Sequence, residues 1–339
     1  MTEHDEGPIT VSVVVPVYSG QDYLMRLAEE LDAVRTHWEE IGAPLSLAEL
    51  ILVDDASIDG SPAVIDRIAE RFSWVMPLHL SRNYGQHPAT VAGILFSAGN
   101  WVITMDEDLQ HPPSRIAELL ACAAERSADV VYAQPTAAVH RSALRDRGSA
   151  GIKQLISWLT GANHVRFVNS FRLIRGEIAR SAASVAIHDT YFDIELGFFS
   201  QRFASLPMAL VDERYVRTGK SGYGIRSLIA HAWRMVFSAH LRLLRFAALL
   251  GAFTTALALF LAVALVVSNL VWPHLVDVRG WASQMVAITF FGGVNTVLIG
   301  IALQYLSTLV LRAHGRPTFF VVDRSKDARL AAFFASRPT

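Results

Sequence analysis

The stretch MDEDLQHPP, residues 105–113, places Asp106, Glu107 and Asp108 directly behind the apolar run WVIT. Adjacent carboxylates repel one another, so the cluster is either a solvated turn, which the two prolines would help to break, or a site for a cation. Hard divalent cations such as Mg²⁺ and Mn²⁺ take oxygen ligands and keep positions for phosphate oxygens. The residue types therefore favour a metal that neutralises a departing diphosphate.

Short runs rich in Val, Ile and Leu alternate with helical patterns over the first 135 residues. Continuous apolar strands joined by helices predict a mostly parallel sheet covered on both faces, whose ligands bind beyond the carboxyl ends of the strands. The spacing predicts strands at 11–17, 49–55, 74–80, 101–108 and 129–135, and helices at 21–39, 61–72, 86–98 and 114–127.

Polar segments follow the first, second and fourth of these strands: PVYSG, DDAS and DEDLQ. Parallel strands end at one edge of their sheet, so Asp54, Asp55, Asp106 and Asp108 are expected to converge there. Asp54 has an alternative role as a cap of the turn or of the next helix. Glu107 is expected to matter less, because alternate residues of an extended strand end face opposite sides.

The turn after the first strand, PVYSGQD, has no G-x-G-x-x-G pattern, which argues against a dinucleotide-binding fold. The chain also contains no Walker loop. Any nucleotide would therefore be bound by a metal and by side chains more than by a glycine-rich cradle.

Composition indicates that part of the chain lies in lipid. Mean hydropathy is +0.32 and only 18% of residues are charged, against about a quarter in soluble domains. Ranges 246–272 and 285–311 contain no charged residue, and each exceeds the ~20 residues that a membrane span needs. The alternative is a pair of buried core helices. Basic residues outside both ranges predict a hairpin with both flanks in the cytoplasm.

Residues 225–245 have the pattern of a basic amphipathic helix, which would lie in the lipid headgroup layer or, alternatively, pack on the soluble domain. Residues 214–276 contain seven Arg and Lys and no Asp or Glu. This local charge would attract anionic groups to a bilayer surface.

The whole chain carries a formal net charge of −1, which does not suggest nucleic acid as a partner. Its single cysteine, Cys122, excludes an intramolecular disulfide and fits a reducing compartment. The acidic N-terminus MTEHDEGPIT does not have the basic start of a secretory signal, so the N-terminal domain is expected to stay inside the cell.

An ordered set of motifs carries a family resemblance: VSVVVPVY, LILVDDAS, SRNYGQHPATVAG, ITMDEDLQHPP and SFRLI, followed by GKSGY and the two apolar ranges. The set resembles the family-2 glycosyltransferases that load sugars onto polyprenyl phosphate. It is similar to the undecaprenyl-phosphate aminoarabinose and glucosyl transferases and the dolichol-phosphate mannose synthases. The likeness runs from about residue 10 to residue 325.

The resemblance implies an α/β fold with a GT-A-like nucleotide-diphospho-sugar transferase domain and a mostly parallel sheet. This cytoplasmic catalytic domain would cover residues 1–224 and be followed by the amphipathic juxtamembrane helix, 225–245. A two-helix transmembrane hairpin would cover 246–311 and a cytoplasmic tail 312–339. The implied location is the inner membrane, as a multi-pass protein and a homo-oligomer, by resemblance a tetramer.

The resemblance also assigns site residues on the nucleotide side. Pro16 and Tyr18 would line the base pocket, and Asp55 would contact the nucleoside. Mg²⁺ or Mn²⁺ would be held against the diphosphate by the D-x-D-x-Q ligands Asp106, Asp108 and Gln110.

Arg82 and His87, in the loop RNYGQH, would lie beside the diphosphate and donor sugar; surface and helix-start chemistry is the alternative for both. Arg172 could hold the acceptor phosphate or be buried in a structural pair with an acid. The segment GKSGYG could be a lid over a lipid phosphate or only a flexible loop. Further candidates for the acceptor phosphate are Arg214, Arg217, Lys220 and Ser221.

Three departures from the family pattern stand out. Ser19 and Gly20 occupy positions where Asn and Glu usually follow the tyrosine, which puts one nucleoside contact in doubt. Asn-Ser-Phe-Arg, residues 169–172, replaces the common Gly-Asp-Phe-Arg and removes a carboxylate sometimes viewed as a base. Ser-Gly-Tyr, residues 221–223, replaces Ser-Lys-Tyr, and Lys220 stands two positions earlier.

The expected reaction is transfer of a sugar from a nucleotide sugar, with uridine favoured over guanosine, to polyprenyl phosphate. A phosphate oxygen of the lipid is already anionic near neutral pH, so no strong general base is needed, and in-line attack predicts inversion. Two alternatives stay open: a transferase acting on a polysaccharide or another lipid, and a non-catalytic membrane scaffold or translocation partner.

Overall fold

The computed structural model describes residues 7–136, 167–186, 191–209, some positions between 249 and 271, 280–313, 317–323 and 326–327. Contacts divide the chain into two units. The first combines Met1–Met235 with Pro317–Thr339, and the second is Val236–Arg316. The chain therefore leaves the first unit and later returns to it.

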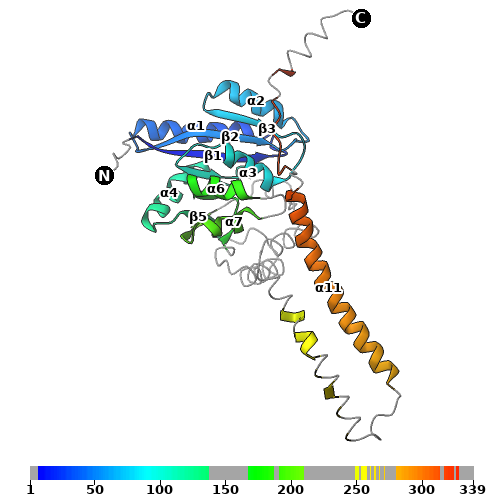
Figure 1. Ribbon diagram of the computed structural model, residues 1–339. Coiled ribbons are helices and arrows are strands. Elements are labelled where there is room, and N and C mark those ends of the chain that lie inside the picture. The colour runs from blue at the N-terminus through cyan, green and yellow to red at the C-terminus, as the bar shows by residue number, and fades with distance from the viewer. Residues whose placement is uncertain are drawn as a thin grey trace, which may run out of the picture. The chain divides into compact units, whose positions relative to one another are not determined.

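The first unit is built on a seven-stranded sheet of order β3-β2-β1-β4-β6-β5-β7 (Figure 1). Among the described strands only β6 runs antiparallel to its neighbours, so the predicted mostly parallel sheet is confirmed. The strands are β1 (Ile9–Val17), β2 (Leu45–Asp54), β3 (Val75–His79), β4 (Trp101–Thr104), β5 (Val130–Pro135), β6 (Arg172–Arg175) and β7 (Phe203–Met208).

Helices cover both faces of the sheet, as predicted. One face carries α1 (Leu24–Glu40), α2 (Ser61–Arg71), a short 3-10 helix (Pro113–Arg115) and α4 (Ile116–Glu125). The other face carries α3 (Gln86–Phe96), α6 (Gly176–Val185) and α7 (Phe192–Phe199).

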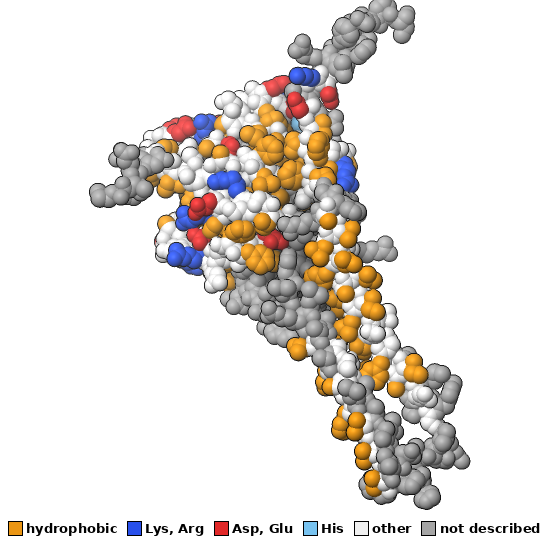
Figure 2. Space-filling model, in the orientation of Figure 1, with side chains coloured by type: hydrophobic (Ala, Val, Ile, Leu, Met, Phe, Trp, Pro, Cys, Tyr) orange, Lys and Arg blue, Asp and Glu red, His pale blue; other side chains and the backbone are white. Residues whose placement is uncertain are grey.

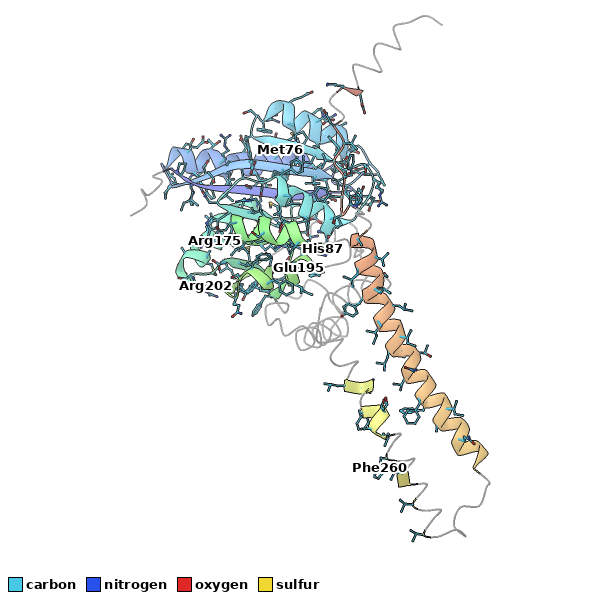
Figure 3. The ribbon with its side chains drawn as sticks, in the orientation of Figure 1. Met76, His87, Arg175, Glu195, Arg202 and Phe260 are labelled. Atoms are coloured by element: carbon cyan, nitrogen blue, oxygen red, sulfur yellow. The ribbon has the colours of Figure 1, made fainter. Side chains whose placement is uncertain are left out.

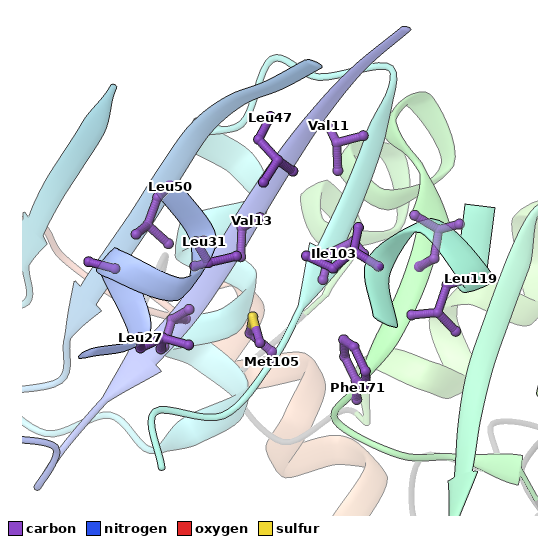
Figure 4. Packing of buried hydrophobic residues seen from close by; sticks show 14 of the residues in the cluster. Val11, Val13, Leu27, Leu31, Leu47, Leu50, Ile103, Met105, Leu119 and Phe171 are labelled. Carbon is purple, nitrogen blue, oxygen red and sulfur yellow. The ribbon is translucent and has the colours of Figure 1, made fainter. Parts of the chain in front are cut away.

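The alternation of strand side chains explains why both layers are needed. Val13 of β1 packs with Leu27 and Leu31 of α1 on one face (Figure 4), whereas Val14 belongs to the cluster on the α3 face. A strand buried on both sides reads as an unbroken apolar run, which is the pattern VSVVVPV shows.

Strand β4 ends at Thr104 instead of continuing to 108, so the prediction for its end was wrong. After Thr104 the backbone makes one more sheet contact, from the N–H of Met105 to the carbonyl of Val14 at 3.1 Å. The N–H of Asp106 then donates to the ring of His111 at 2.9 Å. The acidic cluster consequently forms a turn at the carboxyl edge of the sheet.

The second unit contains α11 (Trp281–Ala313), in which Phe290–Ser307 is long and apolar enough to cross a membrane. It is the one such helix among the described residues. Figure 2 shows apolar side chains along α11. Phe290, Leu303 and Leu309 of this helix are each more than half exposed. The predicted first span, 246–272, is described only in part, and the predicted amphipathic helix, 225–245, lies outside the described residues.

After α11 the segment 317–323 joins the edge of the sheet beside β3. Leu80 and Val321 form an antiparallel bridge. The N–H of Ser81 donates to the carbonyl of Phe320 at 2.9 Å, and the N–H of Val322 donates to the carbonyl of His79 at 2.8 Å. Phe319 and Val321 pack against the cluster on the α3 face, so this part of the predicted tail belongs to the folded first unit.

Candidate active site

Asp106 is the first residue of the turn after β4, and two other segments of the chain hold its carboxylate. Its carboxylate accepts a hydrogen bond from the Gln86 side-chain amide at 2.7 Å and another from the Ser170 hydroxyl at 2.7 Å. Gln86 begins α3 and Ser170 precedes β6. Because β6 is antiparallel, its first residues lie at the edge where β4 ends, which brings Ser170 to the turn.

Asp108 and Gln110 are brought together as the motif predicts. The backbone N–H and the side-chain amide of Gln110 donate to the Asp108 carboxylate at 3.3 and 2.8 Å. Leu109 between them has a φ of +62°, a strained conformation for a branched side chain, and its side chain is buried in the core. Packing of Leu109 thus fixes a tight turn that presents the two polar residues on either side of it.

His111 completes this turn and was missed in the sequence, although it directly follows the ligand motif. It is buried and stacks on Phe171, with ring centroids 5.0 Å apart. Burial lowers the pKa of His111, so its ring is neutral near pH 7. Since Nδ1 accepts from the N–H of Asp106, the ring proton is on Nε2.

Asp55 anchors the loop that leads into α3. Its two carboxylate oxygens accept from the backbone N–H groups of Tyr84 and Gly85, each at 2.7 Å. Burial raises the pKa of Asp55, and the two backbone hydrogen bonds oppose that rise. Gly85 has a φ of +98°, which other residues rarely adopt. The next residue, Gln86, contacts Asp106, so Asp55 and Asp106 meet at one loop.

Asp54 does not join the predicted cluster, which corrects that expectation. Its carboxylate accepts from the N–H and hydroxyl of Ser57 at 2.8 and 2.6 Å and contacts His79 Nδ1 at 2.9 Å. Consecutive strand residues point to opposite faces, so Asp54 faces away from Asp55. Its role is the alternative one, capping the turn after β2.

The nucleotide-side candidates lie at the same edge of the sheet. Tyr18 follows β1 with its side chain 41% exposed, and Pro16 lies in β1 opposite Val53. Arg82 is exposed and places its guanidinium 4.4 Å from the centre of the Tyr84 ring. The base-pocket role of Pro16 and Tyr18 stays a prediction.

His87 lies in the first turn of α3 (Figure 3). Its ring meets Tyr191 edge-on, with centroids 4.4 Å apart. Arg82 and His87 stand on either side, along the chain, of Tyr84 and Gly85, whose backbone N–H groups donate to Asp55. This loop lies at the N-terminus of α3, the positive end of the helix dipole. The helix-start alternative describes its position, and the proposed contact with a donor sugar stays a prediction.

Arg172 is not brought to Asp106. It is 3% exposed and forms an ion pair with Asp193 of α7, which also accepts from the Tyr132 hydroxyl at 2.8 Å. Burial would lower the pKa of Arg172, but its interactions with Asp193, Tyr132 and Tyr191 together outweigh burial and raise the pKa. The structure therefore supports the structural alternative over a contact with acceptor phosphate. The other acceptor candidates, Arg214, Arg217, Lys220 and Ser221, lie outside the described residues.

The donor set around Asp106 and Asp108 fits a divalent cation that is bound together with phosphate. Both partners of Asp106 are neutral donors, and its side chain is 27% exposed. Within the described residues, groups of three or more His, Cys, Asp or Glu at metal-binding spacing are absent. The turn thus carries two carboxylates, and Mg²⁺ is commonly held by one or two carboxylates when substrate phosphates supply the remaining oxygens.

A family model described as glycosyl transferase family 2 matches residues 12–182, a range that includes the turn after β1, Asp55, Asp106, Asp108 and Ser170. The chain belongs to glycosyl transferase family 2. It is a glycosyltransferase, as the names of its relatives also state. The family match ends within α6, so it covers the D-x-D turn and both segments that hold Asp106.

Two curated relatives of this family-2 enzyme show how far the likeness extends. An undecaprenyl-phosphate 4-deoxy-4-formamido-L-arabinose transferase of Edwardsiella ictaluri is 30% identical over 92% of this chain and 93% of its own. The protein of the same name from Shewanella sediminis is 28% identical over 95% of this chain and 94% of its own.

Among solved structures, mannosyl-3-phosphoglycerate synthase from Rubrobacter xylanophilus matches with a TM-score of 0.47 at 15% identity, over 69% of this chain and 74% of its own. A mannosyltransferase from Pyrobaculum calidifontis in complex with GDP-Man and Mn²⁺ matches with a TM-score of 0.41 at 18% identity, over 89% of this chain and 88% of its own.

Proposed function

We propose that this family-2 glycosyltransferase transfers a sugar from a nucleotide-diphosphate sugar to polyprenyl phosphate, with inversion at the anomeric carbon. One observation carries the proposal: the loop 84–86 contacts Asp55 through its backbone and Asp106 through the Gln86 side chain. We call this place, at the carboxyl edge of the sheet, the corner. Relatives of nearly the same length are named for transfer to undecaprenyl phosphate, which supports the acceptor class.

In the proposed mechanism Asp106, Asp108 and Gln110 would hold Mg²⁺ or Mn²⁺, which neutralises the diphosphate as it departs. Gln86 and Ser170 orient the Asp106 carboxylate, and the Leu109 turn sets Asp108 beside Gln110. Exposed Arg82 and the N-terminus of α3 supply positive charge beside the same corner.

No residue in the described part of this corner is needed as a strong base. Ser170 stands where relatives commonly carry an acid, and its neutral hydroxyl donates a hydrogen bond to Asp106, so it does not replace that acid as a base. An attacking lipid phosphate oxygen is already anionic near neutral pH, so catalysis consists of positioning and charge stabilisation. We assign the acceptor phosphate by sequence alone to three basic residues, Arg214, Arg217 and Lys220, and to Ser221, all outside the described residues.

We also propose that the enzyme is a multi-pass protein of the inner membrane, with the first unit in the cytoplasm. Helix α11 supports one span by length and composition, and the charge-free range 246–272 supports the other. A uridine diphosphate donor and assembly as a homo-oligomer complete the proposal; both come from the family resemblance.

The function is tested with the purified full-length chain, polyprenyl phosphate, Mg²⁺ or Mn²⁺ and a panel of nucleotide sugars. We expect an acid-labile lipid-linked sugar from the wild type, no product above background from Asp106→Asn/Asp108→Asn, and a wild-type yield from the control Glu118→Gln. Glu118 pairs only with exposed Arg115 in the described part of the chain. Transfer to polysaccharide alone would select the alternative acceptor. Full biological activity of the double variant would select a scaffold.

A further inference from the structure

Glu107 stands between the two acidic residues of the D-x-D turn but reaches away from them. Its carboxylate accepts from the backbone N–H of Tyr18 at 2.9 Å and from the N–H of Ser19 at 3.2 and 3.3 Å. The residue is 9% exposed. A buried carboxylate must be compensated, and the two backbone N–H donors contribute to this compensation. The sequence expectation that Glu107 matters less overlooked this contact.

Gly20, next along the same loop, is shaped to admit that carboxylate. A Cβ at position 20 would lie 2.7 Å from Oε2 of Glu107 and 3.2 Å from its Cβ. The backbone of Gly20 cannot easily move aside. Its N–H donates to the Ser61 hydroxyl at 3.0 Å, and its carbonyl accepts from Tyr23 and Leu24 at the start of α1, at 2.8 and 3.1 Å. Any side chain at position 20 must therefore displace the Glu107 carboxylate.

The Glu107 hydrogen bonds connect the two turns of the proposed nucleotide site. Tyr18 belongs to the turn predicted to bind the base, whereas Asp106 and Asp108 belong to the turn predicted to bind the diphosphate. Strand pairing between β1 and β4 ends at Val14 and Thr104, below both turns. Beyond that pair, Glu107 supplies the hydrogen bonds that connect the two turns directly.

We propose that Glu107 is a positioning residue that fixes the nucleoside-binding turn relative to the metal-binding turn, with Gly20 as its matched partner position. The proposal rests on the proposed nucleotide-sugar function and adds residues with a role in donor affinity. It also gives a physical reason for the departure from the family pattern at position 20: a glutamate there and a glutamate at 107 would compete for one space.

The experiment measures the Kd of UDP with Mg²⁺, and the kcat and both KM values for transfer, in the full-length chain. Glu107→Gln adds no volume but replaces one acceptor oxygen by an amide that cannot accept. We expect the Kd of UDP and the donor KM to rise about tenfold, because a hydrogen bond to a charged group is lost. The kcat should change less than about twofold, and the acceptor KM should stay unchanged.

A double-mutant cycle then tests the partnership of the two positions. Gly20→Ala should weaken UDP binding in the wild-type background, because it displaces the Glu107 carboxylate. In the Glu107→Ala background the same change should cost much less, since the carboxylate is gone and only the contact with the Cβ of residue 107, at 3.2 Å, remains. The matched control is Gly60→Ala, whose Cβ would have its three nearest neighbours in the Gln21 side chain, the closest at 2.6 Å, and which should leave the Kd of UDP unchanged.

The positioning role would be overturned if the effects of the two substitutions on the Kd of UDP were additive. It would also be overturned if Glu107→Gln lowered kcat and raised the acceptor KM as much as it raised the donor KM. Thermal unfolding of each variant identifies a loss caused by misfolding; Glu107→Gln is the variant to interpret if Gly20→Ala does not fold. If the wild type binds neither UDP nor GDP, the proposed function fails. If the wild type binds UDP and the cycle is additive, only the positioning role fails.

Discussion

The buried pair of Arg172 and Asp193 offers a decisive test, because the family motif assigns the arginine to substrate whereas the structure assigns it to the core. Replacing Arg172 by Met keeps a long apolar side chain but removes the guanidinium that contacts a carboxylate of 0% exposure. We expect this change to destabilise the first unit more than it alters substrate binding.

The size of the effect follows from the burial of both charges. Removing one partner of a buried ion pair costs about 3 to 5 kcal/mol, because the remaining charge stays out of water. For a domain of about 200 residues, 1 kcal/mol shifts the melting temperature by about 2 to 4 °C. Arg172→Met should therefore lower Tm by ~6 to 20 °C. Removing all the polar partners together, in Tyr132→Phe/Arg172→Met/Asp193→Leu, should recover most of that loss.

The assay combines thermal unfolding with transfer kinetics on the same preparations. The structural role predicts that Tm falls in the single variant and recovers in the triple variant, with the acceptor KM of folded enzyme within about twofold of wild type. A wild-type Tm for Arg172→Met together with a large rise in the KM for polyprenyl phosphate would refute the structural role and return Arg172 to the acceptor site.

Two further outcomes follow from the edge of the sheet at β3. The hydrogen bond to Asp54 raises the pKa of His79 despite partial burial, and the bonds from His79 and Ser57 lower that of Asp54 against the effect of its burial. Protonated His79 therefore contributes its full stabilisation below its unfolded pKa of ~6.5, and this stabilisation is lost as pH rises through the folded pKa. Ionised Asp54 contributes stabilisation that is lost as pH falls below ~3.8. Raising the pH from 6 to 8.5 should lower the Tm of the wild type more than that of His79→Gln, and equal pH slopes would contradict this. Val322→Pro, which removes the donor to the His79 carbonyl, should lower Tm by ~2 to 6 °C relative to Val322→Ala, and identical melting curves would show that the segment contributes no stability.

The local pattern of the chain was sufficient to predict the central part of the fold. Strands β1, β2, β3 and β5 overlap the predicted ranges, and in β1 a Val-rich run buried on both faces leaves few alternatives. Strands β6 and β7 were not predicted. Strand β6, Arg172–Arg175, is short and carries an arginine at each end, and its strand character comes from pairing with β4 and β5.

The direction of individual side chains was harder to predict than the position of the strands. Asp54 and Asp55 are adjacent and identical in type, but consecutive residues of a strand point to opposite faces. Asp54 therefore contacts Ser57 and His79, whereas Asp55 contacts the loop before α3. Glu107 and Gly20 are linked through a space that a single sequence does not reveal. Sequence spacing could locate the D-x-D turn, but not Gln86 and Ser170, which reach it from segments that are distant along the chain.

The return of residues 317–323 to the sheet constrains how the chain can pass through a bilayer. Both ends of Val236–Arg316 lead into one folded unit, and the returning end is bonded to the residues that follow β3. A chain that starts and finishes on the same side of a barrier crosses it an even number of times. The proposed arrangement meets this condition, because α11 and the charge-free range 246–272 would together make two crossings.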